Sequence, residues 1–194
     1  MIYSRAAFVE RRQHSSDSVA RGPELIRPST ELNMAAGLAG KPDDRKFLNF
    51  TLEKEGKWLG PFCFVQGADT QFGLKDNWGK ETPEEEQSWE DELELTRQAI
   101  KGVNNLRPKP KFFIVCGDMV DAFPWKKNYD AQFKDFQSVF QDLDPEIPLL
   151  CVCGNHDVGD SPTAETISTY KSNYGDDYYS FWVGGKRGSV ELEL

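Results

Sequence analysis

The sequence predicts an α/β fold in which helices alternate with the strands of a layered, parallel sheet. Three short apolar runs support this prediction, at residues 61–66 (PFCFVQ), 112–116 (FFIVC) and 148–153 (PLLCVC). They are nearly continuous rather than alternating, which is typical of strands buried on both faces of a parallel sheet. Helical patterns lie between consecutive runs, so the expected order is β-α-β-α-β with right-handed crossovers.

The two connecting helices are predicted from caps and apolar spacing. The first is expected from about residue 83 to residue 106, with Thr82 as N-cap and Glu85 completing a capping box. The second is expected over residues 129–143, where aromatic residues recur at helical spacing. A short helix over residues 163–174 and a fourth strand over residues 178–183 should follow.

Composition shifts suggest three regions in the chain. Residues 1–47 are polar, rich in Arg and Ser, and without a sustained period, so they are expected to form a disordered N-terminal extension. Residues 48–185 carry the strands and helices. Residues 186–194 (KRGSVELEL) are polar and are expected to form a divergent C-terminal tail.

Overall composition narrows the classes of function. The chain has 194 residues and a formal net charge of -9, whereas nucleic-acid binding usually needs a basic face, so no nucleic-acid partner is expected. No apolar stretch is long enough to cross a membrane and no signal peptide is visible, so we expect a cytoplasmic protein without a membrane partner. The four cysteines suit reduced, buried thiols in that compartment.

A glycine followed by oxygen-bearing side chains comes after each predicted strand. The three segments are Gly67-Ala68-Asp69-Thr70-Gln71, Gly117-Asp118-Met119-Val120-Asp121 and Gly154-Asn155-His156-Asp157. Parallel strands end at one edge of a sheet, where such folds bind ligands. Four side chains are therefore expected to face one another there: Asp69, Asp118, Asn155 and His156.

The expected donor set consists of two carboxylates, one amide oxygen and one imidazole. Such a mixed set suits Mn, Fe or Zn better than a soft metal that prefers thiolates. A central aspartate can bridge two divalent ions about 3.5–4 Å apart, and such a pair holds a hydroxide for in-line attack on phosphorus. The pattern therefore indicates metal-dependent hydrolysis of a phosphoric ester.

The stretches GADTQ, GDMVDA and GNHD together resemble the motifs of the calcineurin-like phosphoesterase family, also called metallophosphatases. The similarity covers about residues 56–185. It implies a metallophosphatase-type fold with two divalent metal ions as cofactors, namely Mn, Fe or Zn. It also implies serine/threonine protein phosphatase activity, with phosphoproteins as substrates.

The family pattern assigns a role to each matching residue. Asp69 would bind the first metal, Asp118 would bridge both, and Asn155 would bind the second through its amide oxygen. His156 would contact the phosphate and protonate the leaving alkoxide as a general acid. Asp121 would orient the imidazole of His156 as a carboxylate partner, although an ordinary loop carboxylate is the alternative there.

The sequence departs from the family pattern at two points. Gln71 stands where the first motif usually has a histidine, and its oxygen would bind the metal, hold a water on it, or do neither. The family also supplies three more metal-binding histidines, whereas this chain has no histidine after His156. We therefore expect a domain truncated before its second sheet, with an uncovered inner face and weak or partial metal binding.

Three functions follow from these observations. The first is a metal-dependent phosphatase for phosphoserine or phosphothreonine. The second is a non-catalytic truncated isoform that binds a partner or acts as a decoy, and the third is a phosphodiesterase of the same family. The histidine count separates the first function from the second. Nothing in the sequence separates the first from the third, and no oligomeric state is predicted.

Overall fold

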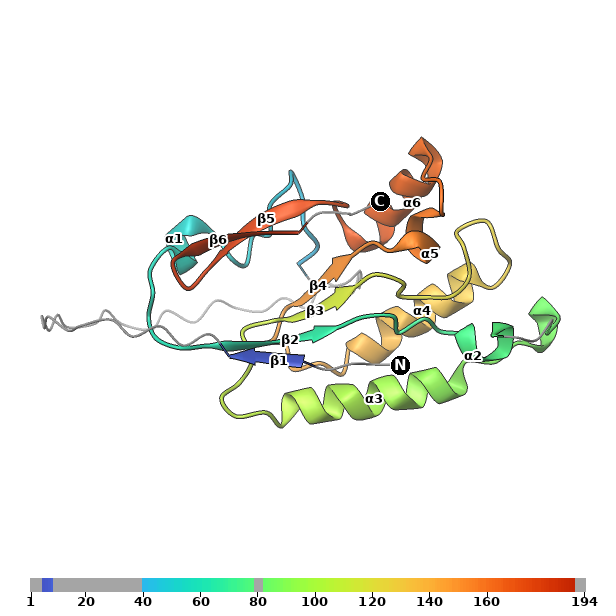
Figure 1. The fold of residues 1–194 in the computed structure, drawn as a ribbon, viewed down its shortest axis with the longest axis horizontal. Helices are drawn as coiled ribbons and strands as arrows, with labels where there is room; N and C mark the ends of the chain where they lie inside the picture. The colour runs from blue at the N-terminus through green and yellow to red at the C-terminus, as the bar shows by residue number, and fades with distance from the viewer. Residues whose placement is uncertain (1–4, 9–39, 79–81, 191–194) are drawn as a thin grey trace, which may run out of the picture.

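The computed structural model describes residues 5–8, 40–78 and 82–190, and it confirms an α/β fold built on a parallel sheet. The main sheet has four strands in the order β1 (Arg5–Phe8), β2 (Cys63–Gly67), β3 (Phe113–Cys116) and β4 (Leu149–Val152) (Figure 1). Strands β2, β3 and β4 are parallel, and β1 pairs antiparallel with β2. The three parallel strands are the three apolar runs of the sequence.

One face of the sheet is covered by helices. The two crossover helices, α3 (Glu90–Asn104) and α4 (Tyr129–Phe140), pack beneath it (Figure 1), and α6 (Ala164–Tyr174) contributes Tyr170 and Tyr174 to the same core. Thr163 caps α6 by accepting a hydrogen bond from Thr166, so this helix lies where it was predicted. Burial of each large apolar side chain stabilises such a core by about 1.5–3 kcal/mol.

A second, two-stranded sheet covers part of the opposite face (Figure 1). Strands β5 (Tyr179–Val183) and β6 (Lys186–Val190) form an antiparallel hairpin, and the short helix α1 (Leu52–Glu55) contacts β5. Between the two sheets lies a second core cluster, whose buried members are Phe47, Phe50, Phe112, Ile114, Leu150, Val152, Tyr179 and Phe181.

The hairpin differs from what the sequence suggested. The strand predicted at residues 178–183 does not join the main sheet but pairs with β6. It buries Tyr179 and Phe181 on one side and leaves alternate residues half exposed. Residues 186–190, expected to begin a tail, pair with β5 instead. The face expected to be uncovered is therefore partly filled by aromatic side chains.

The first crossover helix begins later than predicted. Residues Glu84–Glu86 form a single 3₁₀ turn, Gln87 is extended, and α3 starts only at Glu90. Thr82 does not cap the helix, since its hydroxyl donates to the carbonyl of Asp76. Contacts between this segment and the end of α2 (Leu74–Asn77) therefore override the local helix signal.

The last part of the predicted N-terminal extension is folded. Phe47 is buried in the second cluster, the amide of Arg45 donates to Asp176, and Lys41 donates to the carbonyl of Ser172. Residues 1–4 and 9–39 lie outside the described residues. Within the described ranges, no helix has the length and apolar character needed to span a membrane.

Candidate functional site

The carboxyl ends of β2, β3 and β4 meet at one edge of the sheet, next to the short helices α2 and α5 (Asn155–Val158) (Figure 1). Backbone hydrogen bonds connect the loop after β2 to the loop after β3, from Asp69 to Gly117 at 3.1 Å and from Gln71 to Asp118 at 2.9 Å. The buried hydroxyl of Thr70 adds a third link, by donating to the carbonyl of Met119 at 2.7 Å. The predicted convergence of the strand ends is therefore present.

Two strand-end glycines allow the loops after β3 and β4 to come together. Gly117 has a φ of 78°, and a Cβ there would lie 3.0 Å from the Cα of Gly154. A Cβ on Gly154 would in turn collide with the carboxylate and amide nitrogen of Asp118. Any larger residue at position 154 would therefore displace Asp118, which explains why a glycine precedes the polar residues.

Three of the predicted metal ligands have left-handed backbone conformations. The φ angle is 52° at Asp69, 40° at Gln71 and 50° at Asp118. Such conformations are uncommon for residues other than glycine, and they concentrate where surrounding structure holds a functional side chain in place. The hydrogen bonds between the β2 and β3 loops supply that restraint.

The two carboxylates of the cluster lie close enough to repel each other. Partial burial raises the pKa of Asp69, and the nearby charge of Asp118 raises it further. Two like charges at one sheet edge are unfavourable without a counter-charge. A divalent cation between them would remove that repulsion.

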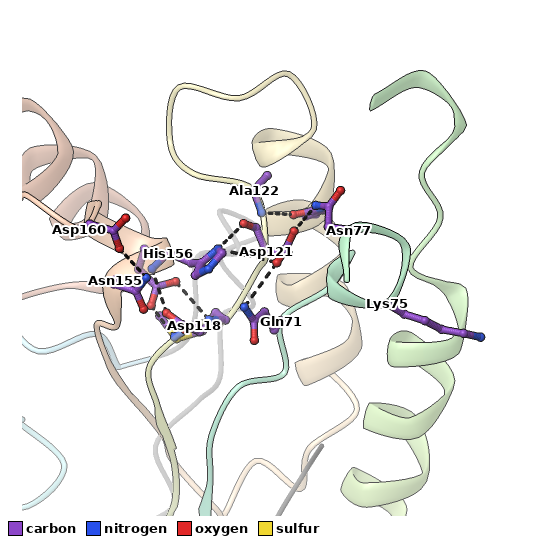
Figure 2. Close-up of polar contacts among 12 residues, drawn as sticks. Gln71, Lys75, Asn77, Asp118, Asp121, Ala122, Asn155, His156 and Asp160 are labelled. Carbon is purple, nitrogen blue, oxygen red and sulfur yellow. Dashed lines mark hydrogen bonds and ion pairs between the residues drawn. The ribbon is translucent and has the colours of Figure 1, made fainter. Parts of the chain in front are cut away.

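The amide side chains are held in orientations that suit metal binding. The Nε2 atom of Gln71 donates to Asp121 at 3.4 Å, and the Nδ2 atom of Asn155 donates to Asp160 at 2.8 Å (Figure 2). Because each nitrogen is engaged, the carbonyl oxygen is the end left to act as a ligand. Anchoring of a ligand by an outer partner is typical of metal sites.

The donor chemistry therefore suits divalent cations, with two carboxylates, two amide oxygens and one imidazole. The set is poor in strong ligands, however. In the part of the chain that the structure describes, no group of three or more His, Cys, Asp or Glu side chains is arranged to hold a metal ion. Amide oxygens would have to complete the coordination, so this set on its own favours weak binding.

His156 is oriented mainly by the backbone of Asp121. Its Nδ1 atom lies 2.5 Å from the carbonyl oxygen of Asp121 and 3.8 Å from the carboxylate oxygen Oδ1 (Figure 2). The sequence had suggested the carboxylate as the direct partner. A carbonyl can only accept a hydrogen bond, so Nδ1 carries the proton and Nε2 is the ring nitrogen left for chemistry.

Two further contacts hold the histidine. Its backbone N–H donates to the carboxylate of Asp118 at 2.9 Å, which connects the predicted general acid to the predicted bridging ligand. The ring of Phe123 stacks on the imidazole, with centroids 4.6 Å apart and planes inclined by 11°. The ring is therefore fixed from its edge and from one face.

The sequence of this chain matches the model of a known protein family. The family model described as calcineurin-like phosphoesterase matches residues 64–191. The chain belongs to the calcineurin-like phosphoesterase family. The match confirms the resemblance of GADTQ, GDMVDA and GNHD, and it includes the hairpin strand β6.

Curated relatives in this phosphoesterase family are similar over most of the chain. The serine/threonine-protein phosphatase CPPED1 of Bos taurus is 47% identical over 152 residues, or 78% of this chain and 49% of the relative. The protein of the same name from Mus musculus is 50% identical over 70% of this chain and 44% of the relative. The Homo sapiens protein is 45% identical over 78% and 48%. The chain thus spans about half the length of these relatives.

Asp157 is a residue of the candidate site whose contribution the sequence did not reveal. It is fully buried and accepts hydrogen bonds from the backbone N–H groups of Asp118, Met119 and Gly154, at 2.8–3.1 Å. Burial raises its pKa to about 8, while these N–H groups act in the opposite direction. Its position in the GNHD stretch was visible, but only the structure shows that it joins two loops.

Asn77 and Phe123 were also missed. Asn77, at the end of α2, donates to the carboxylate oxygen Oδ2 of Asp121 (Figure 2), and Phe123 stacks on His156. Neither residue belongs to a strand-end motif. Asn77 lies 44 positions before Asp121 in the chain, so no local pattern could have connected them.

Proposed function

We propose that the strand-end cluster is the active site of a metal-dependent phosphoric-ester hydrolase that acts on phosphoserine or phosphothreonine in proteins. The observation that carries this proposal is the convergence of Asp69, Asp118 and Asn155 at three parallel strand ends, with His156 beside them. The names of the relatives, which are serine/threonine-protein phosphatases, support the substrate class.

Asp69, Gln71, Asp118 and Asn155 are the residues that would hold the metal ions, which we propose to be Mn, Fe or Zn. Divalent cations bound there would neutralise the phosphoryl oxygens and lower the pKa of a water molecule. The chain itself sets the direction of each ligand oxygen, through the left-handed backbone of the first three residues and the anchored amide of the fourth.

His156 would supply the proton for the leaving group. As a water molecule attacks phosphorus, the bond between phosphorus and the serine or threonine oxygen breaks, and that oxygen needs a proton. With Nδ1 directed to the carbonyl of Asp121, the protonated ring can donate from Nε2.

A second candidate function is phosphoprotein binding without hydrolysis, as a non-catalytic or decoy form. The favouring observation is the ligand set. His156 is the last of only two histidines in the chain, and amides must complete the coordination. Loss of imidazole ligands lowers metal affinity, since even loss of an outer partner typically costs 10–100-fold.

The deciding experiment measures hydrolysis of para-nitrophenyl phosphate by the purified chain while Mn, Fe and Zn are titrated. We expect metal-dependent turnover that falls at least ~100-fold in Asp118→Asn. Asparagine keeps the acceptor for the N–H of His156, so this variant should fold normally. Asp130→Asn, on the exposed side of α4, is the matched control and should keep full activity.

Two companion substrates separate the alternatives. Hydrolysis of a phosphoserine peptide supports the protein phosphatase, whereas preference for bis(para-nitrophenyl) phosphate would identify a phosphodiesterase. Binding of the phosphopeptide without turnover, by a chain with a native circular dichroism spectrum, would reject catalysis and favour the decoy.

A further inference from the structure

A cleft with a volume of about 730 Å³ lies beside the candidate site. Asp121 and His156 line the part of the cleft that belongs to that site. Glu84 and Lys126 also line it, although neither belongs to the strand-end cluster. The cleft therefore extends from the proposed place of the phosphate to an ion pair that the proposed reaction does not use.

A chain of hydrogen-bonded amides connects the two ends of the cleft. Asn77 donates to the carboxylate of Asp121 (Figure 2), and Gln87 donates from Nε2 to the Oδ1 atom of Asn77 at 2.6 Å. Asn128 donates from Nδ2 to the Oε1 atom of Gln87 and to the backbone carbonyl of Glu84, both at 2.8 Å. These amides fix the position of Glu84 relative to the candidate site.

The ion pair at the far end of the cleft is loose. The Nζ atom of Lys126 lies 3.6 Å from the Oε1 atom of Glu84, and the two side chains are 50% and 37% exposed. Exposed pairs of this kind contribute little to stability, so another cation can displace the lysine at small cost. An arginine is well suited to do so, because its planar guanidinium binds a carboxylate through two parallel hydrogen bonds.

An exposed tryptophan lines the same cleft. Trp78 directly follows Asn77 in the chain and is 75% exposed. The face of an indole ring attracts cations, and guanidinium groups stack on it. Exposed Glu85 and Glu86 follow Glu84 on the same 3₁₀ turn and make its surroundings more negative. A carboxylate and an aromatic ring in one cleft are thus complementary to a basic side chain.

We propose that this cleft binds the polypeptide next to the phosphorylated residue, and that Glu84 and Trp78 select substrates with a basic residue, above all arginine, within a few positions of the phosphate. The proposal rests on the proposed phosphatase function and adds the chemistry of the surrounding substrate sequence. Lys126 leaves Glu84 when the basic side chain binds. In the competing outcomes, an acidic substrate residue pairs with Lys126, or a bulky apolar residue contacts Trp78 alone.

The test compares phosphoserine peptides that differ at a single position. Each carries Arg, Ala, Glu or Phe at one of the four positions on either side of the phosphoserine, and kcat/KM is measured with Mn present. We expect Arg to raise kcat/KM about 5-fold over Ala at one or more positions, and Glu to lower it. The gain should shrink as salt is added, because exposed charges are screened. Fluorescence anisotropy of the labelled peptides with Asp118→Asn should show the same order in binding.

Three variants assign the preference to particular residues. Glu84→Gln keeps the shape and the backbone carbonyl that Asn128 uses, and it should abolish the preference for Arg. Lys126→Met removes the competing ammonium group and should increase the preference. Glu85→Gln, on the same 3₁₀ turn but outside the cleft lining, is the matched control and should retain it.

A preference for Glu or Phe over Arg, or an Arg preference that survives Glu84→Gln, would overturn the proposal. If Glu84→Gln does not fold, Trp78→Ala decides, because it should reduce the Arg preference about 2-fold or more. Arg-dependent binding without hydrolysis would reject the phosphatase function and keep the role of the cleft. Hydrolysis at equal rates for the Arg and Ala peptides would reject the role of the cleft alone. Neither binding nor hydrolysis would reject both.

Discussion

At the scale of single residues, the candidate site depends on side chains that form hydrogen bonds with the backbone. Asp157 is the clearest case, since its carboxylate accepts three N–H groups from the loops after β3 and β4. Those loops carry Asp118 and Asn155. The position of both predicted ligands therefore depends on a residue that was not itself predicted as a ligand.

Replacing Asp157 with alanine should destabilise the chain severely. The substitution leaves three N–H groups without their acceptor in a buried region, and each such group costs about 1–3 kcal/mol. We expect a loss of at least ~3 kcal/mol in the free energy of unfolding, measured by urea denaturation. Asp142→Ala, on an exposed turn, should stay within about 0.5 kcal/mol. Equal midpoints for the two variants would contradict this role.

At the scale of elements, ion pairs join the segments that precede β3 and β4, at the end of the sheet opposite the site. Lys109 precedes β3, and its ammonium lies 2.6 Å from Asp144 and 2.5 Å from Glu146, which both precede β4. The lysine thus connects the segments that lead into two neighbouring parallel strands. Lys109 lowers the pKa of Asp144 through this hydrogen bond, and the backbone N–H of Glu146 adds to the effect.

This ion pair predicts a pH-dependent contribution to stability. A carboxyl group with a lowered pKa in the folded state stabilises the fold above its unfolded pKa, about 3.9, and loses that contribution as pH falls through the folded value. Lys109→Met should therefore lower Tm at neutral pH, and the difference from the unmodified chain should shrink toward zero in acid. Thermal unfolding at several pH values measures it, with exposed Lys101→Met as control. A difference that grows in acid would refute the pairing.

At the scale of the whole molecule, aromatic packing joins segments that are far apart in the sequence. Phe181 of the hairpin lies 5.6 Å from Phe112 of the main sheet and 6.1 Å from Phe50, measured between ring centroids. Phe47 and Tyr179 extend the same cluster. The hairpin and residues 47–50 therefore pack together on the same face of the sheet.

Truncation of Phe181 tests this packing. Phe181→Ala leaves a cavity between the two sheets, and such substitutions typically cost about 3–5 kcal/mol. Chemical denaturation should show a loss of that size, together with increased amide exchange in β5 and β6. Leu48→Ala, where the side chain is 61% exposed, should change stability by less than about 0.5 kcal/mol. A small effect of Phe181→Ala would mean that the hairpin contributes little to the fold.

The sequence by itself determined the three parallel strands, the two crossover helices and the polar residues at the strand ends. These features depend on apolar runs, helical spacing and Gly-Asp or Gly-Asn pairs, which are local patterns. The family match agrees with the same motifs. Asp69, Asp118, Asn155 and His156 were predicted because each follows a strand within a few residues, whereas Gln71 was named as a candidate from the family motif.

Only the tertiary structure decided which distant groups meet. Because of contacts with α2, helix α3 begins only at Glu90. Residues predicted as a strand and a tail form a hairpin whose aromatic side chains pack on the main sheet. Asn77 forms a hydrogen bond with Asp121, which lies 44 positions later in the chain. The structure also shows that a backbone carbonyl holds His156. The physical reason is that each of these outcomes depends on burial and hydrogen bonds between segments far apart in the chain, and no local pattern of residues records which segments will meet.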